Sequence, residues 1–410
     1  MDSPMDKQLR AFLIRLPPDV RPHLGMYEPI VQKVLRKVRE VLPVIRQQQR
    51  EAGKLVDGLL ERYTPEGRRD GIRRSRKLQT WAVASELCRR SREMVFSDTK
   101  QAAHLGQLAV EVSMNVSNDT PAVDDLRALC FATLGNAYRV MRWYKESSEH
   151  FELAYQHLGS EGSGDIYAQA DIFSLHSSLL KDQQFFAEAL VVLDQAISLL
   201  KGEGDERRLA RCLIQRACVL SVSGEKSNAI KVYLDALHIL DEYEDPWLLF
   251  FATQNLASLY CDLDRFKLAR SALKSLSEEV IEAALGPSRQ SNRLQLSWTR
   301  ARIAAGLGKR AQALRALAEV EEGFVALPDP IMAALVALDA AKLYHKGRDH
   351  RRVEETVMRV YATLAEHDLP QAIQEIVSML VEAAEERRLI EQSLEMAIRR
   401  LQDTRARRPC

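Results

Sequence analysis

The densest group of side chains able to do chemistry is a basic run in the N-terminal part of the chain. Within "RYTPEGRRDGIRRSRKLQTW" six cations fall in ten residues: Arg68, Arg69, Arg73, Arg74, Arg76 and Lys77. Such a cluster attracts phosphates by releasing their counterions, and the neighbouring Trp81 can stack on a base. The first 100 residues carry 22 Lys and Arg against 13 Asp and Glu, so the rest of the chain is acidic. Two interpretations follow, a nucleic-acid contact and a linker that docks on the acidic body of the same chain.

The sequence carries no motif typical of an active site. It contains no G-x-S-x-G, no H-E-x-x-H and no Gly-rich phosphate loop. The closest histidines, His345 and His350, fall on either side of a predicted turn, and the six cysteines form no C-x-x-C pair. A Cys–His pair assembled by the fold stays open, because sequence distance does not exclude it. We therefore expect a non-enzymatic protein with no cofactor and no metal site.

Composition favours a helical protein that does not enter a membrane. Apolar residues make up 46% of the chain, charged residues 28% and aromatic residues 6%, a mixture typical of helical proteins. The longest apolar run, "ALVVLDQAISLL", is interrupted by Asp194 and is too short to span a bilayer. The N-terminus lacks the apolar core of a secretory signal. We expect a cytoplasmic protein with no membrane contact.

The elements that position the polar side chains are indicated by small residues that recur in pairs. The second member of each pair returns every 40 to 45 residues, and the first lies twelve residues earlier. Small residues at a fixed distance allow two helices to pack closely. The second members are Ala102, Ser147, Ala189, Ala229, Ala269, Ala313 and Val353, and the first are Arg90, Gly135, Ser177, Ala217, Ala257, Ala301 and Ala341. Short polar turns such as "MRWYKES" and "VSGEKSN" lie between the two positions and predict helical hairpins.

The unit "LGNAYRVMRWYKESSEHFELAY" resembles the tetratricopeptide repeat, which has small, small and aromatic residues at these places. The resemblance covers about residues 83–365, and the interval near 40 is similar to the long-helix branch that includes kinesin light chain repeats and bacterial peptide-sensing regulators. It implies an all-α, right-handed superhelical solenoid of about seven helical hairpins whose first helices line the inner face. An ordinary bundle of stacked helices is the alternative. The first unit departs from the pattern, with Arg90 where a small residue belongs.

The polar residues of the first helices are the expected binding site. Amides, hydroxyls and alternating charges suit the backbone of an extended peptide or a partner helix, although any solvated concave wall is polar. The expected peptide or protein contacts are Asn136, Arg139, Lys181, Arg211, Gln215, Asn255 and Arg302. The helical periodicity of the first helices also places Gln254, Asp262, Thr299, Asp339 and Lys342 on the inner face. The resulting hypothesis is an adaptor in a bacterial signalling, regulatory or defence assembly, with nucleic-acid binding through residues 68–77 as the alternative.

Two flanks complete the expected organisation. Residues 1–80 should form a basic helical region, with Pro43 kinking or interrupting its main helix, and residues 81–365 should form the repeat array. Residues 366–410 should form a C-terminal helix with a basic tail. The heptad seam of this helix includes Leu380, Leu394, Ala397 and Leu401. The seam predicts a cap on the last repeat, with a homodimer as the second interpretation.

Overall fold

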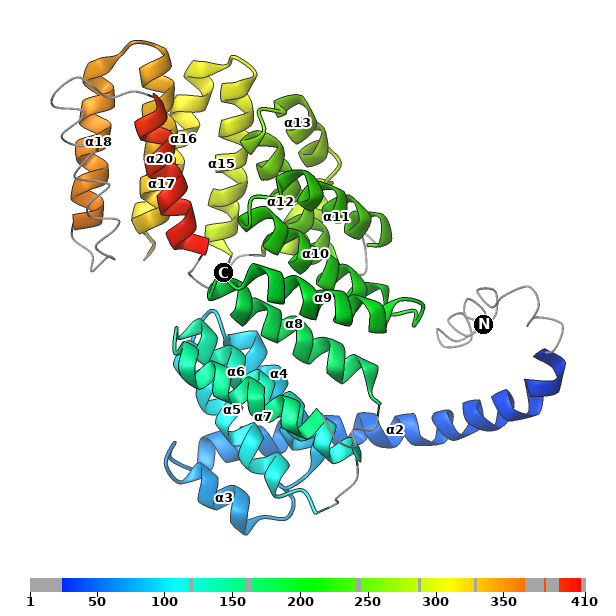
Figure 1. Ribbon diagram of the computed structural model, residues 1–410. Helices are drawn as coiled ribbons and strands as arrows, with labels where there is room; N and C mark the ends of the chain where they lie inside the picture. Colours follow the sequence, from blue (N-terminus) through cyan, green and yellow to red (C-terminus); the bar gives the residue numbers. More distant parts are fainter. Residues whose placement is uncertain are drawn as a thin grey trace. The chain divides into compact units, whose positions relative to one another are not determined.

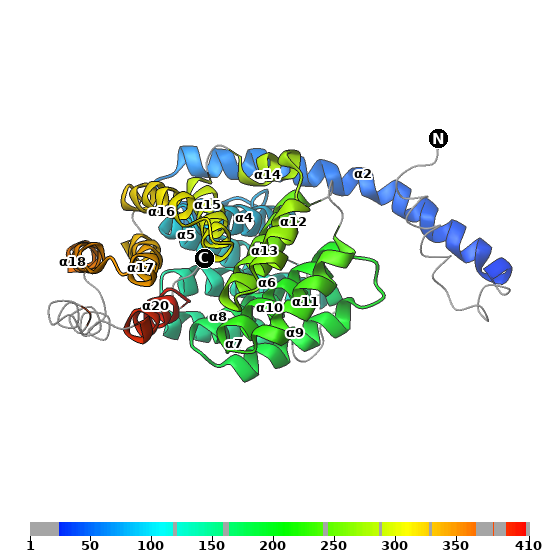
Figure 2. The same ribbon diagram turned by 90° about the horizontal axis from the view of Figure 1, so that it is seen from above.

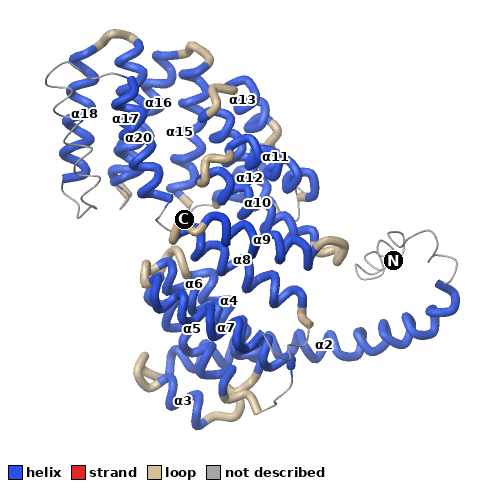
Figure 3. The backbone as a smooth tube through the Cα atoms, in the orientation of Figure 1, coloured by secondary structure: helices blue, strands red, loops and turns tan. Residues whose placement is uncertain are grey.

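The structure is a computed structural model that describes residues 24–117, 121–158, 164–240, 245–286, 289–327, 330–365, 380 and 391–406. Within these ranges the chain forms 18 helices and no strand (Figure 3). The predicted all-α solenoid of helical hairpins is confirmed. Its handedness stays a prediction.

Most of the helices pair into consecutive hairpins at the positions that the small residues predict (Figure 1). The hairpins are α4 (Trp81–Met94) with α5 (Thr99–Met114), α6 (Pro121–Val140) with α7 (Tyr144–Leu158), α10 (Glu206–Val222) with α11 (Lys226–Ile239), α12 (Pro246–Asp262) with α13 (Phe266–Lys274), α15 (Gln290–Gly306) with α16 (Arg310–Val325), and α17 (Pro330–Lys346) with α18 (His350–Ala365). The third pair in sequence order, α8 (Ile166–Asp182) and α9 (Phe186–Leu200), is divided between the two compact units of the chain. The remaining helices are α2 (Leu24–Arg62), α3 (Arg68–Arg74), α14 (Glu278–Leu285) and α20 (Glu391–Ala406).

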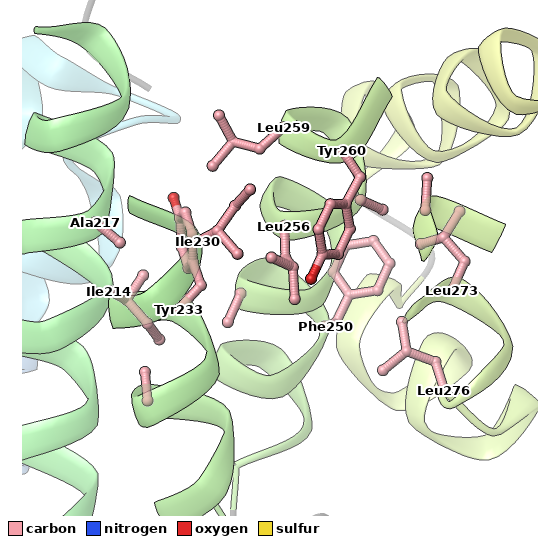
Figure 4. Packing of buried hydrophobic residues seen from close by; sticks show 14 of the residues in the cluster. Ile214, Ala217, Ile230, Tyr233, Phe250, Leu256, Leu259, Tyr260, Leu273 and Leu276 are labelled. Carbon is pink, nitrogen blue, oxygen red and sulfur yellow. The ribbon is translucent and has the colours of Figure 1, made fainter. Parts of the chain in front are cut away.

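The chain divides into two compact units. Unit 1 comprises residues 1–179 with 198–204, and unit 2 comprises residues 180–197 with 205–410. Figure 4 shows the packing in unit 2, where Tyr233 of α11 and Leu256 of α12 lie in one apolar cluster. The division into residues 1–80, 81–365 and 366–410 stays a prediction.

Small residues bring the two helices of a hairpin together as expected. In α6, a Cβ added at Gly135 would fall 3.2 Å from the ring of Phe151. The hydroxyl of Ser147 donates a hydrogen bond to the carbonyl oxygen of Gly135 at 2.8 Å. In unit 2, Ala217, Ala229, Ala257 and Ala269 have no exposed surface. A larger side chain at any of these positions would push the helix axes apart.

Arg90 departs from the small-residue pattern because it attaches α2 to the first hairpin. Its guanidinium forms an ion pair with Asp57 of α2 at 2.6 Å and donates to the carbonyl oxygen of Gly53 at 3.2 Å. The same group pairs with Glu86 on its own helix at 2.7 Å. Beside these contacts α2 buries Val56. Pro43 lies inside α2 and does not interrupt it.

Six hairpin turns share one backbone feature. In each, the residue two positions after the first helix has a positive φ: Arg142, Gln184, Gly224, Asp264, Gly308 and Arg348. This left-handed conformation reverses the chain in few residues, and it strains any residue other than glycine. Four of the six turns therefore carry a conformational cost that the surrounding packing offsets.

The fifth hairpin differs from the regular pattern, because its second helix is split into α13 and α14. Ser277 begins the new helix and its hydroxyl accepts a hydrogen bond from the amide of Val280 at 3.2 Å. A serine at this place offers the backbone an N-cap. The split was not predicted from the sequence.

The C-terminal helix α20 covers the last hairpin. Leu394, Ala397 and Leu401 are buried in the cluster that also contains the apolar face of α17. These are three of the predicted seam positions, and their burial supports the cap. Residues 366–379 and 381–390 of the predicted helix lie outside the described residues, and the homodimer stays a prediction.

Candidate partner-binding face

Polar side chains of three successive first helices of unit 2 meet around Arg302. Its guanidinium forms an ion pair with Asp262 of α12 at 2.6 Å and lies 3.6 Å from Asp339 of α17. It also donates to the hydroxyl of Ser258 at 3.3 Å. Figure 2 shows these helices, α12, α15 and α17, in succession. The sequence placed all three charged residues on the inner face.

Two further contacts extend this arrangement along α15. The indole N–H of Trp298 donates to Asp339 at 2.8 Å. One turn away, the side-chain amide of Gln254 donates to the hydroxyl of Thr299 at 2.7 Å and to the carbonyl oxygen of Gln295 at 3.1 Å. We call the Arg302 group and the neighbouring Gln254–Thr299 pair together the polar ladder. It consists of Gln254, Asp262, Trp298, Thr299, Arg302, Asp339 and Lys342.

Ion pairs with second-layer helices close both ends of the polar ladder. Lys226, the first residue of α11, lies 3.3 Å from Asp262. Lys342 lies 3.1 Å from Glu395 of α20. The C-terminal cap is therefore joined to the polar ladder by charge as well as by apolar packing. In sum, the ladder's cations and anions are largely neutralised within the chain.

Burial determines the electrostatics of the central pair. The side chains of Arg302 and Asp339 are each 19% exposed. Burial raises the pKa of Asp339, although Arg302 and the Trp298 N–H oppose the rise. Burial lowers the pKa of Arg302, but Asp339 and Asp262 outweigh it, so the net shift is upward. Arg302 is thus a permanent cation held between two carboxylates.

One polar atom of the ladder is unsatisfied. Gln254 is 7% exposed, and its Oε1 accepts no hydrogen bond from the described part of the chain. A flipped amide does not solve this, because the nitrogen must donate to the carbonyl oxygen of Gln295. A buried carbonyl without a donor costs free energy, and native structures keep few of them.

The other predicted contacts are distributed over both units. In unit 1, Asn136 and Arg139 are each 5% exposed, and Arg139 donates to Asn136 at 3.0 Å. In unit 2, Lys181 pairs with Asp182 at 3.1 Å. Arg211, Gln215 and Asn255 are half-buried on α10 and α12. The structure thus brings Arg302 alone of the seven predicted contacts into the ladder, and the role of all seven stays a prediction.

Most of the basic N-terminal run lies in α3, which packs on α5. Arg73 forms an ion pair with Glu111 at 2.7 Å, Arg69 donates to Gln107 at 3.4 Å, and Arg68 donates to the carbonyl oxygen of Leu60 at 2.9 Å. These contacts are those expected of a linker docked on its own chain. Arg74, Arg76 and Lys77 are exposed and form no ion pair with the described residues.

Sequence reasoning missed Trp298, Lys226 and Glu395. Trp298 lies four residues before Arg302, which is the helical spacing that brings two side chains to one face, so this signal was present. Lys226 and Glu395 come from a second helix and from the cap. Their position depends on tertiary packing, which no local pattern encodes.

Three side chains in unit 1, those of Cys88, Cys130 and His176, have shifted pKa values. Cys88 and Cys130 lie with their sulfurs 3.5 Å apart, and the hydrogen bond between them lowers the pKa of Cys88 and raises that of Cys130. Burial lowers the pKa of His176 to about 4, and its Nδ1 lies 2.7 Å from the hydroxyl of Tyr155. Thiols this deeply buried are poor nucleophiles.

Neither a metal centre nor a membrane span is found in the described part of the chain. Among those residues no group of three or more His, Cys, Asp or Glu is placed to hold a metal ion. No helix there has the length and apolar character needed to cross a membrane.

The fold is similar to solved structures of helical-repeat proteins. The apo form of RapI matches with a TM-score of 0.54 and 15% identity, over 92% of this chain and 98% of RapI. Aspartyl phosphate phosphatase F from Bacillus subtilis matches with a TM-score of 0.51 and 15% identity, over 83% of this chain and 91% of that protein. A Rap protein complexed with competence and sporulation factor matches with a TM-score of 0.48 and 12% identity, over 88% and 99%. No protein-family model matches the sequence, and no curated protein does.

Proposed function

We propose that this chain is a non-enzymatic adaptor that binds a peptide or protein segment along the first helices of its repeats, in a bacterial signalling, regulatory or defence assembly. The polar ladder is the observation that carries the proposal. It places hydrogen-bonding groups on three successive first helices, around Arg302. The helical-repeat fold shared with RapI supports it, because such arrays present extended binding surfaces.

The chemistry of the ladder favours a peptide backbone over a strongly charged ligand. Asp262 and Asp339 neutralise Arg302, and Glu395 neutralises Lys342. What remains is the side-chain oxygen of Gln254, because its nitrogen and the Thr299 hydroxyl already have partners. A backbone N–H is a suitable donor for that oxygen, since peptide groups both donate and accept. The oxygen is buried, so the Gln254 side chain would have to turn outward to meet it.

The test selects ligands from a random-peptide phage library on the full chain and measures their affinity for variants. Arg211→Ala with Asn255→Ala removes two half-buried predicted contacts outside the ladder, so helicity should survive. Affinity should fall by about tenfold or more. The matched control is Lys231→Ala with Asp235→Ala, two exposed residues of the second helix α11. Equal affinity of the test and control variants would count against the proposal.

A second candidate is nucleic-acid binding through residues 68–77, with the repeats sensing a signal. The exposed and unpaired side chains of Arg74, Arg76 and Lys77 favour it. Binding would show a steep salt dependence that disappears when these three residues are neutralised. Absence of a gel shift at low salt contradicts this candidate.

A further inference from the structure

The turns of hairpins five, six and seven, all in unit 2, carry a row of unpaired cations. It consists of Arg265, Lys267, Lys309, Arg310 and Arg348. All five side chains are exposed, and none forms an ion pair with the described residues. We call this row the basic turn edge. It lies on the turns that join first and second helices, and the nearest ladder residue along the chain is Asp262, three residues before Arg265.

Neighbouring turns of this row touch one another. A Cβ added at Gly347, in the turn before α18, would fall 2.0 Å from Cζ of Arg310 at the start of α16. Only a glycine there allows the guanidinium to lie so close to the next turn. Figure 1 shows the α15–α16 and α17–α18 turns at the same upper edge. The cations of hairpins six and seven therefore lie on adjoining turns. Hairpin five adjoins hairpin six in the same way, because a Cβ added at Gly306, the last residue of α15, would fall 2.1 Å from the ring of Phe266.

The positions of these cations do not favour helix stability. α16 begins after Lys309 with Arg310 and carries Glu319, Glu321 and Glu322 in its second half. The helix macrodipole favours the opposite order, with anions at the N-terminus and cations at the C-terminus. The preceding turn of unit 2 behaves differently, since Lys226 at the start of α11 is paired with Asp262. Lys309 and Arg310 thus gain no favourable interaction from the helix dipole or from an anion among the described residues.

The composition of the edge selects its partner. Leu268 is the one large apolar side chain exposed among residues 262–270, 305–315 and 344–352, whereas a protein interface needs an apolar core. Three of the five cations are arginines, whose planar fork matches phosphate oxygens. No Trp, Phe or Tyr is exposed in these segments to stack on a base. We propose that the basic turn edge binds the phosphodiester backbone of a nucleic acid without reading its sequence.

Fluorescence anisotropy of the full chain with a labelled oligonucleotide of about 20 nucleotides, single-stranded and duplex, tests this at about 25 mM salt. Lys309→Glu with Arg310→Glu should weaken binding by at least about tenfold. The melting temperature should not fall, because glutamates at the start of α16 suit the macrodipole. In the neutral variant, Lys309→Gln with Arg310→Gln, the slope of log K against log salt should decrease by about two.

Two controls make the outcome decisive. Arg142→Glu with Lys145→Glu makes the same charge change on the exposed turn of the second hairpin, in unit 1, and should leave binding unchanged. Polyglutamate of equal length is the competitor for an acidic polypeptide, and it should compete poorly. The proposal is overturned by absence of binding at low salt, by loss of binding when Arg74, Arg76 and Lys77 are neutralised but not in the Lys309/Arg310 variant, or by polyglutamate competing as well as the oligonucleotide. These measurements do not depend on peptide binding, so either proposal can fail alone.

Discussion

Unit 1 and unit 2 use half-buried arginines for different purposes. In unit 1, Arg90 holds α2, a helix outside the hairpins, against the first hairpin. In unit 2, Arg302 joins one first helix to the next by pairing with Asp262 and lying beside Asp339. Arg90 breaks the small-residue pattern of the repeat, whereas Arg302 follows the small residue Ala301 at an expected polar position. The comparison indicates that an arginine can attach an added helix where the pattern is broken and can join neighbouring repeats where it is kept.

The largest expected effect comes from Arg302→Met. The change leaves Asp262 and Asp339 partly buried without their central cation, which should destabilise unit 2 by about 3 kcal/mol. Hydrogen exchange of α15 and α17 peptides measures the loss of stability, and α4 peptides should keep their protection. Adding Asp339→Asn to Arg302→Met should restore part of the lost stability. A loss below about 1 kcal/mol would mean that the ladder contributes little beyond its geometry.

Acidification should change the stability contributions of His176 in unit 1 and Asp339 in unit 2 in opposite directions. His176 of unit 1 has its pKa lowered to about 4, so the unfolded chain takes up a proton first as pH falls below about 6.5. The contribution of neutral His176 to the free energy of unfolding is complete above that pH. It falls by up to about 3 kcal/mol as the pH drops through the folded-state pKa. Asp339 of unit 2 has a raised pKa, so its protonation stabilises the folded state on acidification. Hydrogen exchange between pH 6.5 and 4, with His176→Gln as the control, separates these contributions.

Arg90→Ala should destabilise unit 1 by about 1–2 kcal/mol. The effect is smaller because Asp57, the partner of Arg90, is more than half exposed. The variant should release α2, seen as faster proteolysis and faster exchange in residues 52–62. Arg89→Ala is a close control. Arg89 pairs with Glu86 and Glu93 of its own helix, so its loss should leave α2 protected. Equal release in both variants would contradict the attachment role of Arg90.

The smallest effect concerns the turns. Arg348→Gly should stabilise unit 2 by about 0.5–1 kcal/mol, because glycine adopts the positive φ without strain. Gly308→Ala should destabilise it by a similar amount. Chemical denaturation of both variants measures the difference, and a loss of stability in Arg348→Gly would show that the arginine side chain has a contact worth more than the strain.

The hairpins could be predicted from the sequence because their packing depends on small residues at fixed spacing, such as Gly135 with Ser147. The burial of Asn136 and Arg139 could not be predicted, because it depends on how neighbouring helices pack over them, which no local pattern encodes. Arg302, Asp262 and Asp339 were placed on one face correctly. Glu395 could not be placed there, because α20 reaches α17 only through tertiary packing.

The left-handed turn residues give the chain equivalent points for recombination. Gln184, Gly224 and Asp264 each have a positive φ and each lie two residues after a first helix, and the two segments that they delimit are equally long. Exchanging or duplicating a segment between such points would preserve the chain's direction at both junctions. An array of this kind can therefore gain or lose a repeat through a single in-frame crossover, with new contacts needed only between neighbouring repeats.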